Sequence, residues 1–413
     1  MVIIYATINS PLKKKNFLKS LKMANHILVL NAGSSSIKFA VFTAAHPLRR
    51  TVQGMISGVG MTPTFHAGNA QGPLPGALPP GPLNHETALT WLFDWLDAGK
   101  HAQQLLGAGH RVVHGGEQYD APLVIDAQNL ASLDALSPLA PLHQPHNLAA
   151  IRVLCKLRPG LPQVACFDTA FHRTQPAVAQ TLALPRAMTT GGLRRYGFHG
   201  LSYEFIAGAL PGVLGAAADG RVIVAHLGNG ASLCAMHGRR SVATTMGFST
   251  LDGLVMGTRC GSIDPGVLLY LMREKNMSPA EVEDMLYRKS GLLGLSEISN
   301  DMRTLLGSDD PRARAAIEQF VYRATLEIGA LTAALEGIDA LVFTGGIGEH
   351  AALIRAMICE KLAWLGVTLD PAANANHASC ISTTASRVSV CIIPTDEEAV
   401  IAQHTHRLLQ ISA

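Results

Sequence analysis

Cysteines, charged residues and long apolar runs are all scarce in this sequence. Seven cysteines occur among 413 residues, an odd number that includes no C-x-x-C pair. The sequence therefore indicates neither a disulfide framework nor a zinc site, and reduced thiols in a cytoplasmic protein fit better. No stretch reaches the ~18 apolar residues that span a bilayer.

Charged residues make up 15% of the chain, and 33 basic residues nearly balance 30 acidic ones, for a net charge of +3. Because the basic residues are scattered, we expect neither nucleic acid nor a membrane surface as a partner. The motif G-x-x-x-x-G-K-[ST] is also missing, which excludes a P-loop nucleotide site.

The length predicts two domains, since single hydrophobic cores rarely grow beyond ~250–300 residues. Residues 1–22 begin with an apolar run and continue with three consecutive lysines, which is the reverse of the order in a signal peptide. We interpret residues 1–22 as a disordered tail, or Met23 as the true start.

Two strand–turn–strand units lie roughly half a chain apart. Residues 27–42 read I-L-V-L, N-A-G-S-S-S, I-K-F-A-V-F, and residues 222–236 read V-I-V-A-H-L, G-N-G-A-S, L-C-A-M. They suggest an internal duplication, although any two β-hairpins share some of this pattern. The mixture of strands and helices predicts an α/β protein with its site in a cleft between the halves. We expect a surface excursion at 68–82, and helices at 86–96, 147–156, 203–209, 279–289, 312–335, 350–365 and 397–409.

Three small-residue turns are candidate phosphate sites. Residues 31–38 combine a glycine and three serines, whose N–H and O–H groups can donate to an anion, with the charge of Lys38. Residues 226–232 offer the same chemistry, and residues 343–350 place glycines between a strand and a helix N-terminus. Each could equally be an ordinary turn, so the turns alone leave the question open.

Five other side chains are candidates for chemistry. Arg111 and Arg259 lie among glycines, where a guanidinium group can reach a carboxylate or phosphate, although either could form a surface salt bridge. Asp168 and His199 lie in apolar runs, as satisfied core residues also do. Glu397 opens the last predicted helix, where it could stabilise the helix dipole or bind a metal.

Nine ordered blocks closely resemble the acetate kinase (acetokinase) family. They are L-N-A-G-S-S-S-I-K, G-H-R-V-V-H-G-G-E, F-D-T-A-F-H, R-R-Y-G-F-H-G, H-L-G-N-G-A-S, G-L-V-M-G-T-R, S-G-L-L-G-L-S, T-G-G-I-G-E and P-T-D-E-E. The resemblance implies the duplicated actin-like α/β fold of sugar kinases, actin and heat-shock ATPases, with two domains around a central cleft. Domain I would span 23–168 plus 396–413, and domain II 169–395.

The resemblance implies reversible transfer of the γ-phosphoryl group of ATP to acetate, with Mg²⁺ (Mn²⁺ as a substitute), in a cytoplasmic homodimer. It implies Arg111 as the carboxylate-binding arginine, and Asn31 and Glu397 as the magnesium-linked pair. The catalytic residues would be Asp168, His199 and Arg259. The acyl pocket would be lined by Val113, Leu142, Phe198 and Thr250. The ATP-binding residues would be Lys38, His226, Leu227, Gly228, Asn229, Gly230, Asp301, Met302, Arg303, Gly346, Ile347, Gly348, Glu349 and His350.

The physics of phosphoryl transfer agrees with these roles. The reaction brings ATP and a carboxylate together, two anions, so arginines and a metal are what it needs. A carboxylic acid with a pKa near ~4 is already ionised at pH 7, so no base is required. We therefore interpret Asp168 as an orienter of the arginines or of metal-bound water.

Four residues depart from the family pattern. Gln144, Ser262, Thr250 and His350 replace the usual Asn, Asp, Pro and Asn. The change at His350 bears on a nucleotide contact, and the change at Thr250 bears on substrate choice. We expect propionate to be a weaker substrate than acetate, with propionate kinase as the alternative function.

Two other classes of protein share some of these features, a dinucleotide-binding oxidoreductase and a non-catalytic ATP-binding protein. Residues 346–351 fit the dinucleotide motif G-x-G-x-x-A, and Asp370 lies near the expected ~20 residues further on. Too little chain follows to complete the sheet of such an oxidoreductase, and the Arg and His blocks stay unexplained. A non-catalytic actin-like ATP-binding protein would share the fold, and only the acyl-site residues argue against it.

Overall fold

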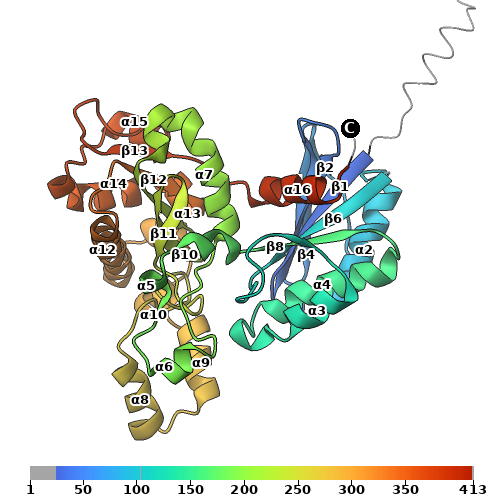
Figure 1. The fold of residues 1–413 in the computed structure, drawn as a ribbon, viewed down its shortest axis with the longest axis horizontal. Helices are drawn as coiled ribbons and strands as arrows, with labels where there is room; N and C mark the ends of the chain where they lie inside the picture. Colours follow the sequence, from blue (N-terminus) through green and yellow to red (C-terminus); the bar gives the residue numbers. More distant parts are fainter. Residues whose placement is uncertain (1–24, 103, 412–413) are drawn as a thin grey trace, which may run out of the picture.

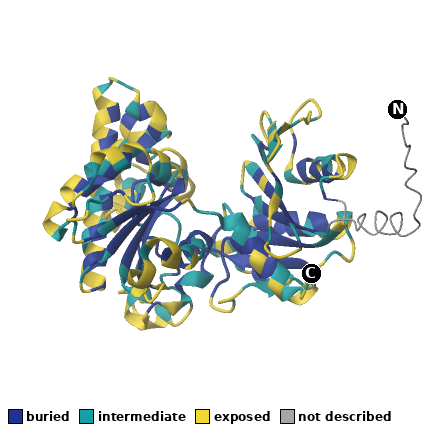
Figure 2. Ribbon diagram, turned by 90° about the horizontal axis from the view of Figure 1, so that it is seen from above, coloured by how far each residue is buried: buried dark blue, intermediate teal, exposed yellow. Residues whose placement is uncertain are grey.

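The computed structural model describes residues 25–102 and 104–411, so the tail predicted at 1–22 lies outside the described residues. Two β-sheets form the centres of two lobes (Figure 1). Figure 2 shows that the central strands of both sheets are buried beneath more exposed helices, whereas outer strands of the first sheet are partly exposed.

The first sheet has the strand order β5-β4-β3-β2-β1-β6-β8-β7. β1 pairs antiparallel with β2 and parallel with β6, which in turn pairs parallel with β8. The apolar run at 27–30 is almost fully buried, as expected of a central strand covered on both faces. The strands are β1 (Asn25–Ala32), β2 (Ser36–Thr43), β3 (Arg50–Ser57), β4 (Thr64–Asn69), β5 (Gly72–Leu74), β6 (Gln104–Val112), β7 (Leu123–Val124) and β8 (Gln163–Phe167).

The second sheet repeats the plan of the first. Its order is β11-β10-β9-β12-β13, with antiparallel pairs β10–β11 and β9–β10 and parallel pairs β9–β12 and β12–β13. This matches β3-β2-β1-β6-β8 strand for strand and direction for direction, so the predicted duplicated α/β fold is confirmed. The strands are β9 (Arg221–Leu227), β10 (Ala231–His237), β11 (Arg240–Thr244), β12 (Ala340–Thr344) and β13 (Ser389–Ile392).

Helices cover the sheets; six of the seven predicted helical segments are found, and the seventh is found in part. Helices of eight or more residues are α2 (His85–Ala98), α3 (Ala127–Asp134), α4 (Gln144–Leu157), α7 (Gly200–Leu214), α8 (Pro265–Glu274), α9 (Pro279–Arg288), α12 (Pro311–Ala334), α14 (Ala352–Lys361) and α16 (Glu397–Leu408). Shorter helices are α5 (Ala177–Gln180), α6 (Arg186–Thr189), α10 (Gly291–Ser296), α11 (Met302–Leu306), α13 (Gly345–His350) and α15 (Pro371–Ala375). Single 3₁₀ turns are η1 (Ser137–Leu139), η2 (Ala170–Thr174), η3 (Gly215–Asp219) and η4 (Ala363–Leu365).

Two segments differ from the sequence prediction. The helix predicted at 350–365 is interrupted at Ala351, whose ψ of 81° is not helical. The buried Arg355 donates to the freed carbonyls of Gly348 and Glu349, which stabilises the break. The surface excursion predicted at 68–82 begins as the paired ends of β4 and β5, since Gly and Pro are tolerated on an edge strand.

Helix α16 returns to the first sheet after the chain has built the second (Figure 1). Its Val400 and Ile401 share a core with Val29 of β1 and with Leu201 at the start of α7. The rest of α7 packs against the second sheet. Residues 200–219 are apolar and long enough to cross a membrane by length and composition alone, which the sequence analysis did not expect, and the packing of α7 buries part of that apolar surface.

Candidate active site

The site forms where parallel strands of the first sheet end. Arg111 lies near the carboxyl end of β6, and Asp168 directly follows β8. Asn31 lies near the end of β1, before the serine-rich turn that joins β1 to β2. Carboxyl ends of neighbouring parallel strands meet at one edge of a sheet, which is where open α/β sheets place their ligands.

Arg111 and Asp168 form a bidentate ion pair. Nε of Arg111 donates to Oδ1 of Asp168 at 2.9 Å, and Nη2 donates to Oδ2 at 2.5 Å. Nη1 donates to Oδ1 of Asn31 at 3.3 Å. Burial alone would lower the pKa of Arg111, but the Asp168 carboxylate raises it above its ordinary value. The pair fixes the plane of the guanidinium and leaves its Nη1 edge toward Asn31.

Two buried amides that the sequence analysis did not assign to the site hold its loops. Asn147 accepts a hydrogen bond from the N–H of Val113 at 3.0 Å and donates to the carbonyl of Ala32 at 2.6 Å. Gln144 accepts from the N–H of His114 and donates to its carbonyl. Gln144, one of the departures from the family pattern, is therefore a support for the segment after β6.

The second lobe contributes two histidines to the site, His199 just before α7 and His226 in β9. Their rings stack with centroids 4.4 Å apart. Nδ1 of His199 is 2.8 Å from Oγ of Ser232, and Nδ1 of His226 is 2.8 Å from Oγ of Ser202. Burial lowers the pKa of His199 well below its ordinary value, and the charges of His226, Arg111 and Arg259 act in the same direction. Both imidazoles are therefore neutral near pH 7, since burial also lowers the pKa of His226 to about 4.

Arg259 lies directly over Gly230. A Cβ at position 230 would fall 2.6 Å from Nη2 of Arg259 and 3.2 Å from Nε2 of His199, so only glycine leaves these two groups in place. Nη1 of Arg259 donates to the carbonyl of Thr250 at 2.8 Å. Burial, with the nearby charge of Arg111, lowers the pKa of Arg259 to about 10. Within the described residues no carboxylate pairs with Arg259, so its charge is open to an anionic ligand.

Glu397, at the start of α16, faces the Arg111–Asp168 pair. Burial raises the pKa of its carboxyl group to about 7; Arg111 opposes this effect, while Asp168 and Glu398 add to it. Such a carboxylate, among other anions, would be stabilised by a divalent cation. Within 25–102 and 104–411, no three or more His, Cys, Asp or Glu side chains are grouped so that they alone could hold a metal ion. One carboxylate with the Asn31 amide nevertheless fits Mg²⁺, which keeps waters and phosphate oxygens as its other ligands.

A cavity of about 500 Å³ lies in the second lobe beside the Gly228–Gly230 turn. It brings together three segments predicted to bind ATP, from the turn, from the start of α11 and from α13. Its lining residues are Gly228, Asn229, Asn300, Asp301, Met302, Arg303, Leu306, Gly346, Ile347, His350 and Ala351. Arg303 pairs with Asp301 at 2.7 Å, and the side chain of His350 is 75% exposed at the rim.

A much smaller cavity of about 10 Å³ lies near Arg259. It contains three of the four predicted acyl-pocket residues, and Val113 packs with Phe198 and Ala140 in the core next to it. His143 and Tyr287 were not predicted. Burial, with the charges of Arg111 and Arg259, lowers the pKa of His143 to about 4. The lining is Leu139, Ala140, Pro141, Leu142, His143, Phe198, Thr250 and Tyr287.

Several predicted residues do not line either cavity. Lys38 is exposed on β2. Leu227 is fully buried, so only its backbone can reach a ligand. Glu349 accepts hydrogen bonds from the N–H groups of Gly345 and Thr395, which makes it a support between α13 and the approach to α16.

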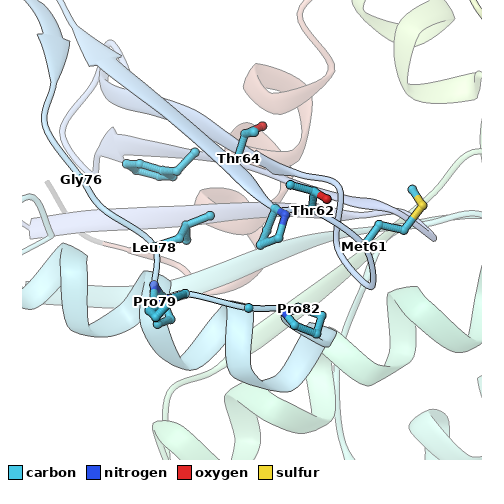
Figure 3. Close-up of a pocket in the computed structure, with 11 residues that line it drawn as sticks. Met61, Thr62, Thr64, Gly76, Leu78, Pro79 and Pro82 are labelled. Atoms are coloured by element: carbon cyan, nitrogen blue, oxygen red, sulfur yellow. The ribbon is translucent and has the colours of Figure 1, made fainter.

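Ser262, another departure from the family pattern, lies outside both cavities. Its hydroxyl donates to Asp252 and accepts from the N–H of Gly253. A further cavity of about 470 Å³ lies beside β4 and residues 76–82 (Figure 3). None of its lining residues is charged, so it offers little to hold a phosphate group.

Comparison with known proteins gives consistent matches over almost the whole chain. The model of the acetokinase family matches residues 26–403. An acetate kinase of Rhodopseudomonas palustris (strain ATCC BAA-98 / CGA009) is 57% identical over 397 residues, which cover 94% of this chain and 99% of the relative. The crystal structure of a Francisella tularensis propionate kinase is similar, with a TM-score of 0.88 and 38% sequence identity. The match covers 93% of this chain and 100% of the propionate kinase. The crystal structure of Porphyromonas gingivalis acetate kinase is similar, with a TM-score of 0.84 and 35% sequence identity. The match covers 94% of this chain and 100% of that kinase.

Proposed function

The chain belongs to the acetokinase family, and from this premise we propose that it is an acetate kinase, which transfers the γ-phosphoryl group of ATP to acetate and also runs in reverse. One observation carries the proposal. Two guanidinium groups and a neutral imidazole, those of Arg111, Arg259 and His199, converge between a large cavity and a very small one. The large cavity suits a nucleotide, and the small one suits a methyl group.

Arg111 binds the carboxylate of acetate. Asp168 accepts two hydrogen bonds from the Nε–Nη2 edge of its guanidinium group and Asn31 accepts one from Nη1, so the free N–H groups are oriented before the substrate arrives. Because acetate is ionised at pH 7, the reaction needs no base. Asp168 therefore acts through Arg111 rather than by taking a proton.

Arg259 and His199 stabilise the phosphoryl group during transfer. The transferred group carries charge on its equatorial oxygens, and catalysis depends on donors placed where that charge lies. Nη2 of Arg259 and Nε2 of His199 both lie over Gly230 in the turn that borders the large cavity. This places one cationic and one neutral donor beside the path from nucleotide to acetate.

The nucleotide lies in the large cavity, with its phosphates toward the turn at 226–230. Asp301, Met302 and Arg303 at the start of α11, and residues 346–350 in α13, line the other walls. Asn31 and Glu397 would hold Mg²⁺ or Mn²⁺. When bound, this ion would neutralise phosphate charge; Arg111 and Arg259 orient the two anionic substrates in the same site.

Acetate is the preferred substrate because the small cavity leaves little room beyond a methyl group. Its volume is about 10 Å³, close to the least space that holds one water molecule. Propionate kinase is the second candidate, and it is supported by the structural likeness to a propionate kinase. The two functions differ only in how readily the wall at Leu142, Phe198 and Thr250 accepts one more methylene.

We also propose a cytoplasmic homodimer with domain I at 23–168 plus 396–413 and domain II at 169–395. All seven cysteines are free thiols, which suits a reducing compartment. Helix α8 buries none of its residues, and its Val267, Leu269 and Tyr270 are exposed. An apolar helix of this kind is typical of a surface that a second copy covers.

The deciding experiment is a hydroxamate assay for acyl phosphate with ATP, Mg²⁺ and formate, acetate, propionate or butyrate. We expect product with acetate, less with propionate and little with butyrate. Product with propionate above that with acetate would favour the second candidate. No acyl phosphate with any acid would refute both.

A further inference from the structure

Ser232 lies between the catalytic imidazole and a buried tyrosine. Its Oγ is 2.8 Å from Nδ1 of His199 and 2.5 Å from the hydroxyl oxygen of Tyr203. Ser232 and Tyr203 are both fully buried, so water does not compete for these bonds. The sequence motifs gave Tyr203 no role, and they gave Ser232 only the end of a candidate phosphate turn.

The direction of the two hydrogen bonds follows from the needs of Tyr203. In the part of the chain that the structure describes, Ser232 is the one hydrogen-bond partner of its hydroxyl. A buried O–H without an acceptor costs about 1–3 kcal/mol. Tyr203 therefore donates to Ser232, and Ser232, whose oxygen now accepts, donates its own hydrogen to Nδ1 of His199.

This direction leaves the single proton of the neutral His199 ring on Nε2. Nε2 lies over Gly230 beside Nη2 of Arg259, so the N–H group points where the phosphoryl group is expected. The backbone keeps the ring there, since His199, the N-cap residue just before α7, has φ +57°, a left-handed conformation that a non-glycine residue holds only when its surroundings require it.

The stacked ring of His226 has the opposite arrangement. Ser202, which contacts Nδ1 of His226, donates its hydrogen to Oγ1 of Thr395 at 2.9 Å. Nδ1 of His226 must then carry the proton and donate to Ser202. Two imidazoles 4.4 Å apart are thus held in different tautomers by different serines.

We propose that Tyr203 and Ser232 are positioning residues that fix the proton of His199 on Nε2, so that this ring meets the phosphoryl group as a hydrogen-bond donor. The role of His199 toward phosphate rests on the proposed function, whereas its tautomer does not. The two parts can therefore be tested separately.

The tautomer is read directly from long-range ¹H–¹⁵N NMR spectra of enzyme labelled with [¹⁵N]histidine. The chain has 17 histidines, and the signals of His199 are those missing from a His199→Gln variant. We expect an Nε2–H ring in the wild type, and a mixed or Nδ1–H ring in Ser232→Ala and Tyr203→Phe. An Nδ1–H ring in the wild type, or an Nε2–H ring unchanged in both variants, would overturn the proposal.

The kinetic part compares Ser232→Ala and Tyr203→Phe with a matched control, Ser241→Ala. Ser241 is also buried in this sheet and contacts an imidazole, Nδ1 of His172 at 2.9 Å. We expect Ser232→Ala to lower kcat by about 10–100-fold with little change in KM for ATP or acetate. A loss no greater than that of Ser241→Ala would contradict the relay. Far-UV circular dichroism and melting temperature check that each variant folds.

His199→Gln supplies a bypass, because the amide of glutamine offers an N–H near the position of Nε2 without needing Ser232. We expect it to retain part of the activity, and Ser232→Ala to cause no further loss in this background. Independent, additive losses would contradict the relay. If the wild type forms no acyl phosphate, the proposed function fails, while the NMR spectra still decide the tautomer.

Discussion

Gly230 lies so close beneath Arg259 that a single methyl group at position 230 would come within 2.6 Å of Nη2. The guanidinium is the far end of a flexible side chain, so we expect Gly230→Ala to displace it rather than to unfold the protein. The displaced charge should lower kcat by about 10²–10³-fold, as removal of a transition-state donor does.

The matched control for Gly230→Ala is Gly208→Ala in α7, where an added Cβ meets open space. Alanine is favoured over glycine in a helix by up to about 1 kcal/mol, so this variant should be fully active and slightly more stable. Steady-state kinetics and thermal melting measure both variants. Full activity in Gly230→Ala would show that Arg259 need not lie where the structure places it.

Replacing Arg111 should mainly weaken acetate binding, whereas replacing Arg259 should mainly slow the phosphoryl transfer. Arg111→Ala should raise KM for acetate strongly, because it removes ground-state binding of the carboxylate. Arg259→Ala should lower kcat by orders of magnitude with a smaller change in KM for acetate. Arg221→Ala is the control, since Arg221 also forms a bidentate pair, with Asp339, at the far end of β9. An Arg259→Ala enzyme in which only KM changes would mean that the two roles are reversed.

Val113→Ala should narrow the preference for acetate over propionate. Val113 packs with Phe198 beside the small cavity, and one methylene in an apolar pocket is worth roughly 1–3 kcal/mol, or about 10–200-fold. Val112→Ala is the control, because Val112 belongs to a different core on the other face of β6. The measurement is kcat/KM for each acid. An unchanged acetate-to-propionate ratio in Val113→Ala would contradict this account of the pocket.

Acid should destabilise the fold through His172. Its Nε2 donates to the carbonyl of Phe198, and burial lowers its pKa to about 4. The fold favours the neutral ring, so the contribution of His172 to the free energy of unfolding is complete above pH 6.5. This contribution is lost as the pH falls toward 4, because the unfolded chain binds the proton first. Over that window the loss is about 3 kcal/mol. Urea unfolding at pH 7 and pH 5 should show a smaller pH effect in His172→Gln than in the wild type; parallel behaviour would rule out His172 as the cause.

Much of the fold can be predicted from local patterns, but the contacts that complete the site cannot. The apolar run at 27–30 predicts a buried strand, yet its pairing with β6 joins residues about 80 positions apart in the chain. Asn147 reads as an ordinary polar residue in the first turn of a helix. Only the folded structure brings it between Val113 and Ala32, where its amide bonds to both.

The same holds for Tyr203 and Ser232. The sequence places Tyr203 at the start of a predicted helix and Ser232 at the end of a predicted phosphate turn. Their hydrogen bond depends on the packing of α7 against β10, which no local periodicity encodes. Residue types thus predict which groups carry charge, while tertiary packing determines which protons they carry.

The position of Glu397 has a consequence for synthesis of the protein. It is supplied by α16, which leaves the ribosome after every other element described here, and α16 packs on β1, one of the first strands to emerge. A nascent chain can therefore complete its second sheet and still lack one of the proposed magnesium ligands. Catalytic competence should therefore require α16, and a premature stop codon just before residue 397 should both expose the face of the first sheet that Val400 and Ile401 cover and abolish activity.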